Sequence, residues 1–210
     1  MLATLSLSWY FTDHLLPAFV KWLLCVAYGM LFTLFAVVCH RLVLLDPAAV
    51  ARYPVPTWSL RESLFFMWML AVWFFYLISW VAFLTVAVNA LMLASASARA
   101  APSDWHEWLE AGAKVPALYV FARLCPLFPA TAVDRRVDLR WAWQLTRGNG
   151  WRLVVVVGVL PWVISHLLGL LYRGDPTALE TIVLSIAGTA LFAVEVAALS
   201  ISYRELTKEA

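Results

Sequence analysis

Long apolar intervals alternate with short polar segments along this chain. No Asp, Glu, Lys or Arg occurs between Glu62 and Arg99, whereas a helix needs only about 20 apolar residues to cross a hydrocarbon core of about 30 Å. Other apolar intervals are nearly as clear, and a Gly-Asp-Pro turn at residues 174–176 separates the last two. The pattern predicts transmembrane helices over residues 15–39, 63–92, 151–172 and 179–202.

A further apolar segment, residues 116–133, is only just long enough to span a bilayer. It contains Pro116, Pro126 and Pro129, and Arg123 lies near its middle. A proline inside a helix removes a hydrogen bond and kinks the chain. The segment therefore crosses as a broken helix or enters and returns. We expect an all-α integral membrane protein, a single domain over residues 1–210, with about five transmembrane helices or, alternatively, four plus a re-entrant segment.

The placement of basic residues predicts the orientation. Cytoplasmic loops of membrane proteins carry an excess of Lys and Arg. Five crossings place the N-terminus outside, and four place it inside. In both topologies residues 134–150 and the C-terminus are cytoplasmic, and most of the basic residues lie on that side.

Two short amphipathic helices are expected at the membrane surface. In residues 104–110, Trp105, Trp108 and Leu109 share one face, which is typical of an interfacial anchor. In residues 137–147, arginines fall on one arc of a helix and apolar residues on another.

The second amphipathic segment is expected to contact lipid headgroups, at about 1 kcal/mol for each guanidinium near an anionic surface. It serves either as an orientation signal or in specific lipid recognition. Apolar side chains at every second position of residues 137–145 would also suit a β-strand. An isolated strand, however, would leave the backbone hydrogen-bonding groups at its edges unpaired. The residues assigned to headgroup contact are Arg136, Arg140, Arg147, Trp141 and Trp143.

Composition excludes several classes of protein. The chain is 64% hydrophobic and 13% charged, whereas a soluble protein has roughly a quarter charged residues. A net charge of +2 provides no basic stripe for a nucleic acid. The cysteines are too widely spaced for a disulfide framework or metal site: Cys25, Cys39 and Cys125. The histidines are likewise not spaced as metal or haem ligands: His14, His40, His106 and His166. We expect no cofactor.

Several short motifs resemble those of a bacterial membrane family. They are HRLVLL at residues 40–45, WQLTRGNGWRL at 143–153, SYRELT at 202–207, and residues 119–134 with Arg123, Leu124, Leu127, Pro129 and Ala130. The family includes the membrane domain attached to some glycerophosphoryl diester phosphodiesterases and many stand-alone proteins of unknown function. The resemblance implies a bacterial inner-membrane location. It does not imply phosphodiesterase activity, because the catalytic barrel, about 250 residues, exceeds this entire chain of 210.

Two ionisable residues lie deep in the apolar segments, Arg123 and Glu195. A charge at such a position is costly and is a functional-site hypothesis by default. Counted from the cytoplasmic ends of their segments, both lie at about the same depth. We therefore expect a buried ion pair, with a proton or substrate path as the alternative.

The remaining features concern packing. Small residues recur every fourth position in the last helix: Ser185, Thr189, Ala193 and Ala197. Such a stripe permits close helix approach. The aromatic face of residues 66–83 contacts lipid or a partner helix, or is a ledge for a quinone or pigment.

Together these features favour a non-catalytic membrane protein rather than an enzyme. The first hypothesis is an accessory or scaffolding subunit that packs against lipids and a larger membrane complex. The alternative is a small transporter or lipid-handling protein that binds anionic headgroups near Arg123, because broken helices often line binding sites.

Overall fold

The computed structural model describes residues 18–51, 57–95, 105–170 and 178–208. Within these residues the secondary structure is helical, without a strand, which confirms the all-α prediction. The elements are α2 (Ala18–Leu44), α3 (Pro47–Ala51), α4 (Leu60–Ser95), α5 (Trp105–Leu124), α6 (Leu127–Ala132), α7 (Leu139–Leu145), α8 (Gly150–Val154), the π-helical turn η1 (Val155–Val159), α9 (Leu160–Leu170) and α10 (Ala178–Lys208). Parts of the first and fourth predicted spans, and the turn at 174–176, lie outside the described residues.

Four helical segments are long and apolar enough to cross a membrane: Phe19–Leu44, Leu60–Leu93, Leu109–Ala132 and Ile182–Lys208. A shorter apolar helix covers Gly150–Ile164. The protein is thus a multi-pass, all-α membrane protein. Helix α2 runs past the predicted end at residue 39 to Leu44, because His40 and Arg41 both find polar partners inside the protein.

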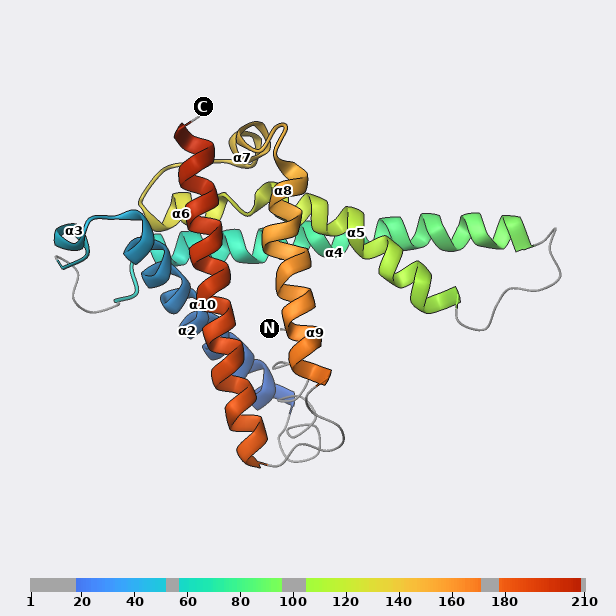
Figure 1. The fold of residues 1–210 in the computed structure, drawn as a ribbon, viewed down its shortest axis with the longest axis horizontal. Coiled ribbons are helices and arrows are strands. Elements are labelled where there is room, and N and C mark those ends of the chain that lie inside the picture. The colour runs from blue at the N-terminus through green and yellow to red at the C-terminus, as the bar shows by residue number, and fades with distance from the viewer. Residues whose placement is uncertain (1–17, 52–56, 96–104, 171–177, 209–210) are drawn as a thin grey trace.

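The long helices form two pairs that point in different directions. Helix α10 packs along α2, and α4 packs along α5. Figure 1 shows α4 running across the view and α10 running down it, while the α4–α5 pair projects to one side. Helix α6 lies between these pairs and contacts α2, α4 and α10.

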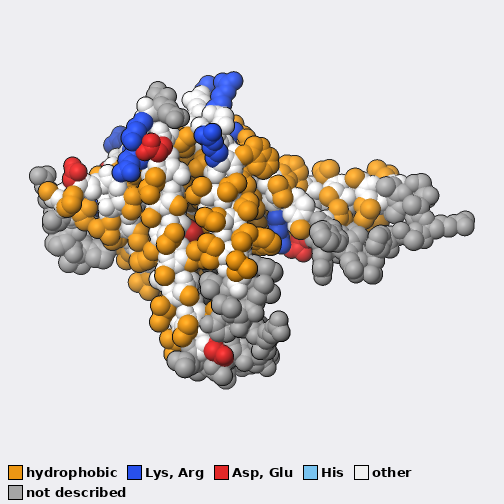
Figure 2. Space-filling model, in the orientation of Figure 1, with side chains coloured by type: hydrophobic (Ala, Val, Ile, Leu, Met, Phe, Trp, Pro, Cys, Tyr) orange, Lys and Arg blue, Asp and Glu red, His pale blue; other side chains and the backbone are white. Residues whose placement is uncertain are grey.

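The core lies around α6. Leu127 is fully buried with Val72 of α4 and Ala142 of α7, and Ala132 packs with Ala36 and Phe65. Hydrophobic side chains cover most of the face seen in Figure 2, and blue basic side chains gather at its upper end.

The proline-containing segment is a broken helix. Helix α5 ends at Leu124, and α6 begins after Pro126. Helix α6 ends in a Schellman motif, in which Arg135 N donates to Ala130 O (2.9 Å) and Asp134 N donates to Thr131 O (3.0 Å). The chain then turns away, because Asp134 has a left-handed φ of 62°.

The two interfacial segments differ from each other. Residues 139–145 form a separate helix, α7, whose N-cap Asp138 accepts a hydrogen bond from Trp141 N (2.7 Å). This segment is therefore helical and not a strand. The expected separate helix at residues 104–110 is instead the beginning of α5, because the chain continues helically past Gly112 to Leu124. The side chains of Trp105 and Trp108 lie outside the described residues.

Candidate functional site

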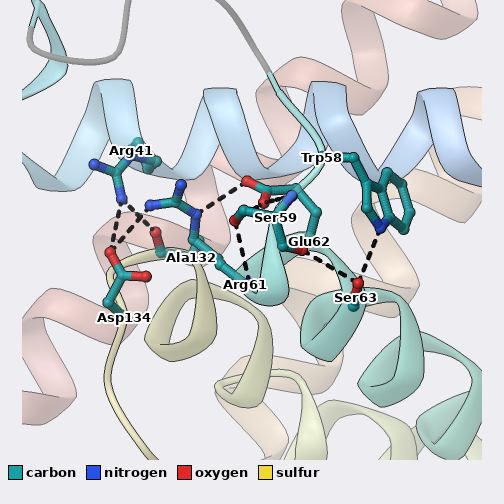
Figure 3. A network of polar contacts seen from close by, with 8 residues as sticks. All are labelled: Arg41, Trp58, Ser59, Arg61, Glu62, Ser63, Ala132 and Asp134. Atoms are coloured by element: carbon teal, nitrogen blue, oxygen red, sulfur yellow. Dashed lines mark hydrogen bonds and ion pairs between the residues drawn. The ribbon is translucent and has the colours of Figure 1, made fainter.

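Two arginines from different helices converge on one carboxylate at the end of the bundle (Figure 3). Arg41, near the end of α2, places Nη1 3.2 Å from Asp134 Oδ2 and 3.1 Å from the carbonyl oxygen of Ala132. Arg61, in the first turn of α4, places Nη1 3.0 Å from the same Oδ2. The Asp134 carboxylate thus joins α2, α4 and the end of α6.

The three side chains are unequally exposed. The side chains of Arg41 and Arg61 are 10% and 14% exposed, and that of Asp134 is 61% exposed. An exposed carboxylate therefore covers two nearly buried guanidinium groups. Left-handed backbone conformation favours glycine, and Asp is among the few other residues that tolerate it.

The start of α4 is fixed by a capping box. Glu62 Oε2 accepts hydrogen bonds from Ser59 N (2.9 Å) and from Ser59 Oγ, while Ser59 Oγ accepts from Arg61 N (3.3 Å). Glu62 Oε1 also accepts from Arg61 Nε at 3.0 Å. The sequence signal for this feature is a serine followed three residues later by glutamate, and our sequence reasoning missed it.

Arg123 is buried against α7 and the start of α8. Its Nε donates to Thr146 Oγ1 (2.6 Å), its Nη1 to the hydroxyl of Tyr119 (3.0 Å), and its Nη2 to the carbonyl oxygen of Trp143. The guanidinium carbon lies 4.2 Å from the centroid of the Trp143 ring. Arg123 is only 7% exposed, so neutral acceptors and an aromatic face stabilise its charge.

The expected ion pair between Arg123 and Glu195 is not formed in the described structure. Arg123 lies near the end of α10, since Ala122 and Leu206 share a core cluster. Glu195 lies eleven residues before Leu206 in that helix, about 16 Å along its axis at 1.5 Å per residue. Arg123 and Glu195 would lie at equal depth only if one straight helix ran from Arg123 to Arg135, whereas the helix ends at Leu124.

His40 and Ser200 join α2 to α10. His40 Nδ1 lies 2.7 Å from Ser200 Oγ, and the Ser200 hydroxyl donates to Val196 O at 2.8 Å. Because that hydroxyl proton is already used, Nδ1 carries the proton donated to Ser200. His40 is 1% exposed and Ser200 is fully buried, so this pair is closed to a substrate.

The residues assigned to lipid headgroups divide into two groups. Arg136, Arg140 and Arg147 are exposed. The two tryptophans instead lie beside arginines of the protein: Arg135 is 5.1 Å from the centroid of Trp141, and Trp143 covers Arg123. The indole of Trp143 is still 43% exposed.

The small-residue stripe of α10 lies at an open hollow of about 550 Å³. Ser185, Thr189 and Ala193 line it together with Phe35 of α2, and Ala197 lies one turn further along α10. In the aromatic face of α4, Phe66 is 6.3 Å from Trp58, and Tyr76 is 6.0 Å from Phe121. These rings therefore pack at least partly within the chain.

No group of three or more metal-ligating side chains occurs within the described ranges. Of the four histidines considered in the sequence, His14 and the side chains of His106 and His166 lie outside those ranges. No family model, curated protein or solved structure matches this chain. The resemblance to the phosphodiesterase-linked membrane family therefore stays a prediction.

Proposed function

We propose that this protein is a non-catalytic accessory or scaffolding subunit that packs against a larger membrane complex and the surrounding lipids. One observation carries the proposal: the buried polar side chains tie helices to one another, while the large uncovered surfaces are apolar. A subunit whose polar contacts fix its own helices and whose outer surface is apolar is suited to packing against other membrane proteins and lipids.

The internal ties connect several different pairs of helices. Asp134 joins α2 and α4 to α6, Arg123 joins α5 to α7, and His40 joins α2 to α10. Hydrogen bonds of buried charged groups are stronger than neutral ones, at about 1.5–3 kcal/mol each. Such hydrogen bonds hold the helices in defined positions. These side chains are therefore already bonded within the chain.

The uncovered surfaces are formed by long helices. Val86 is 66% exposed in α4, as is Ile186 in α10. In a membrane such side chains face lipid or a neighbouring membrane protein. The projection of the α4–α5 pair beyond the rest of the fold (Figure 1) provides a surface that a neighbouring membrane protein can contact without disturbing the α6 core.

The basic end of the molecule supports an orientation. Arg136, Arg140 and Arg147 are exposed on and beside α7, and the C-terminal helix ends nearby in Lys208. Basic side chains at one end favour a cytoplasmic position and contact with anionic headgroups. We propose an inner bacterial membrane with the C-terminus in the cytoplasm.

The alternative of a headgroup site at Arg123 has less support. Three neutral acceptors and two aromatic rings already surround the guanidinium. A Cβ atom on Gly150 would come within 2.9 Å of Arg123 Cδ, so little space remains beside the side chain. A headgroup would have to displace these contacts.

Chemical crosslinking in native membranes, followed by mass spectrometry, tests the proposal. We expect reproducible crosslinks from Lys114 or Lys208 to one other membrane protein, because both lysines are exposed. The matched control is a strain that produces the chain in excess over its partner. The fraction of chain molecules carrying these crosslinks should fall there, because the partner is limiting. Purification of the chain alone with stoichiometric bound lipid would instead favour the lipid-handling alternative.

A further inference from the structure

The outward face of α4 carries a polar side chain whose carboxamide is only partly hydrogen-bonded within the chain. Thr85 and Asn89 are exposed, one helical turn apart, within the apolar segment Leu60–Leu93. The Thr85 hydroxyl donates to Val81 O (2.8 Å), and Asn89 Nδ2 donates to Thr85 O (2.7 Å). A carboxamide has two N–H donors and an oxygen with two lone pairs. Among the described residues, Asn89 Oδ1 accepts no hydrogen bond.

The neighbouring residues form a seam on the same face. Ile78, Ala82, Thr85 and Asn89 are spaced four, three and four positions apart, the spacing of a helix that packs against a second helix as a left-handed coil. All four are exposed. The small side chains of Ala82 and Thr85 in the middle permit the close backbone approach typical of membrane helix pairs.

The opposite face of α4 is turned toward its own chain. Residues about half a turn away from the seam are half-buried, namely Tyr76, Trp80, Leu84, Ala87 and Leu91. Helix α4 packs along α5, with Tyr76 6.0 Å from Phe121. The seam therefore lies at the centre of the arc of α4 that its own chain leaves uncovered.

We propose that this seam is a contact with a second copy of the same chain, in which two α4 helices pack in parallel and Asn89 pairs with Asn89. Two copies inserted into one membrane have the same orientation, so a twofold axis along the membrane normal brings identical residues face to face. A carboxamide is its own hydrogen-bonding complement, because each oxygen accepts from the amide of the other copy. A different partner would need a matching polar group at the same depth, whereas a second copy supplies it by symmetry.

This contact is independent of the accessory role, because that role concerns a different protein. Disulfide crosslinking in membranes tests it, using the full chain with Cys25, Cys39 and Cys125 replaced by alanine. Ala82→Cys lies on the seam, and Phe83→Cys lies at the same depth but about 100° around the helix. We expect a crosslinked dimer from Ala82→Cys at several times the yield from Phe83→Cys, and the same contrast between Ile78→Cys and Leu77→Cys.

The role of the amide is tested in the otherwise unchanged chain by energy transfer between labelled copies in bilayers. Asn89→Leu should weaken dimerisation about three- to twenty-fold, the range that single polar contacts between membrane helices contribute, and Asn89→Gln should retain most of it. Equal crosslinking around α4, seam crosslinks only to another protein, or unchanged dimerisation of Asn89→Leu would each overturn the proposal. Far-UV circular dichroism confirms that each variant compared is folded.

Discussion

The Asp134 carboxylate makes a sharp prediction, because one exposed residue supplies both a charge and an unusual backbone conformation. Asp134→Asn retains the shape and the tolerance of left-handed φ but removes the charge that faces Arg41 and Arg61. Ion pairs with an exposed partner are worth about 0.2–1 kcal/mol each. Asp134 accepts from two guanidiniums that are only 10% and 14% exposed, and its own side chain is 61% exposed. Two such pairs lead us to expect that Asp134→Asn loses about 0.4–2 kcal/mol of stability.

Two further substitutions separate the backbone from the charge. Asp134→Ala removes the charge. It also places alanine, which rarely adopts the left-handed conformation, at a backbone φ of 62°. The left-handed conformation costs an ordinary residue about 1–2 kcal/mol, so alanine should be less stable than asparagine by about 1 kcal/mol. Asp134→Gly removes the charge but accommodates the turn, and should be more stable than alanine by a similar amount.

The assay is reversible unfolding by SDS titration in mixed micelles, followed by far-UV circular dichroism. High salt provides the control for charge: in about 1 M NaCl, where the Debye length is about 3 Å, the gap between wild type and Asp134→Asn should shrink, while the gap between alanine and glycine should persist. Equal stability of wild type and asparagine at low salt would refute the bridging role. Equal stability of alanine and glycine would refute the strain argument.

Three other changes test the remaining ties between helices, each by the same unfolding titration. Arg123→Lys keeps the charge but loses the planar set of donors, and should cost about 2–3 kcal/mol for the lost hydrogen bonds; an unchanged midpoint would contradict this. Gly150→Ala would place a Cβ atom 2.8 Å from a ring carbon of Tyr119, and overpacking of this kind costs about 1–3 kcal/mol; a neutral result would mean that the ring moves freely. Ser200→Ala removes the acceptor of the His40 ring and should cost about 1–3 kcal/mol, whereas Ser200→Thr, which keeps the hydroxyl, should cost less.

The apolar intervals predicted the helices well, because a long charge-free segment forms a helix in a membrane whatever its neighbours are. The interval between Glu62 and Arg99 forms most of α4 (Leu60–Ser95), and the proline-containing segment is broken between α5 and α6. Helix ends were harder to predict. His40 and Arg41 extend α2 because their partners come from α10 and the end of α6, and no local pattern reveals such distant contacts.

The polar contacts were harder to predict than the helix ends, because most of them depend on tertiary structure. The partners of Arg123 on α7, Thr146 and the carbonyl group of Trp143, become neighbours only after the chain turns at the end of α6. The sequence does not mark that turn with a glycine, because the residue with the left-handed backbone conformation is Asp134. The capping box at Ser59 is a local signal that can be read directly from the sequence, although our sequence reasoning missed it.

Native mass spectrometry of the protein, extracted gently from its own membrane, tests whether the chain belongs to a membrane assembly. We expect a complex in which the 23.6 kDa chain is released together with a different integral membrane protein at a fixed ratio. Collisional activation of that complex should liberate both proteins intact. A spectrum containing only this chain, as one or two copies with bound lipid, would show that the protein is not an accessory subunit.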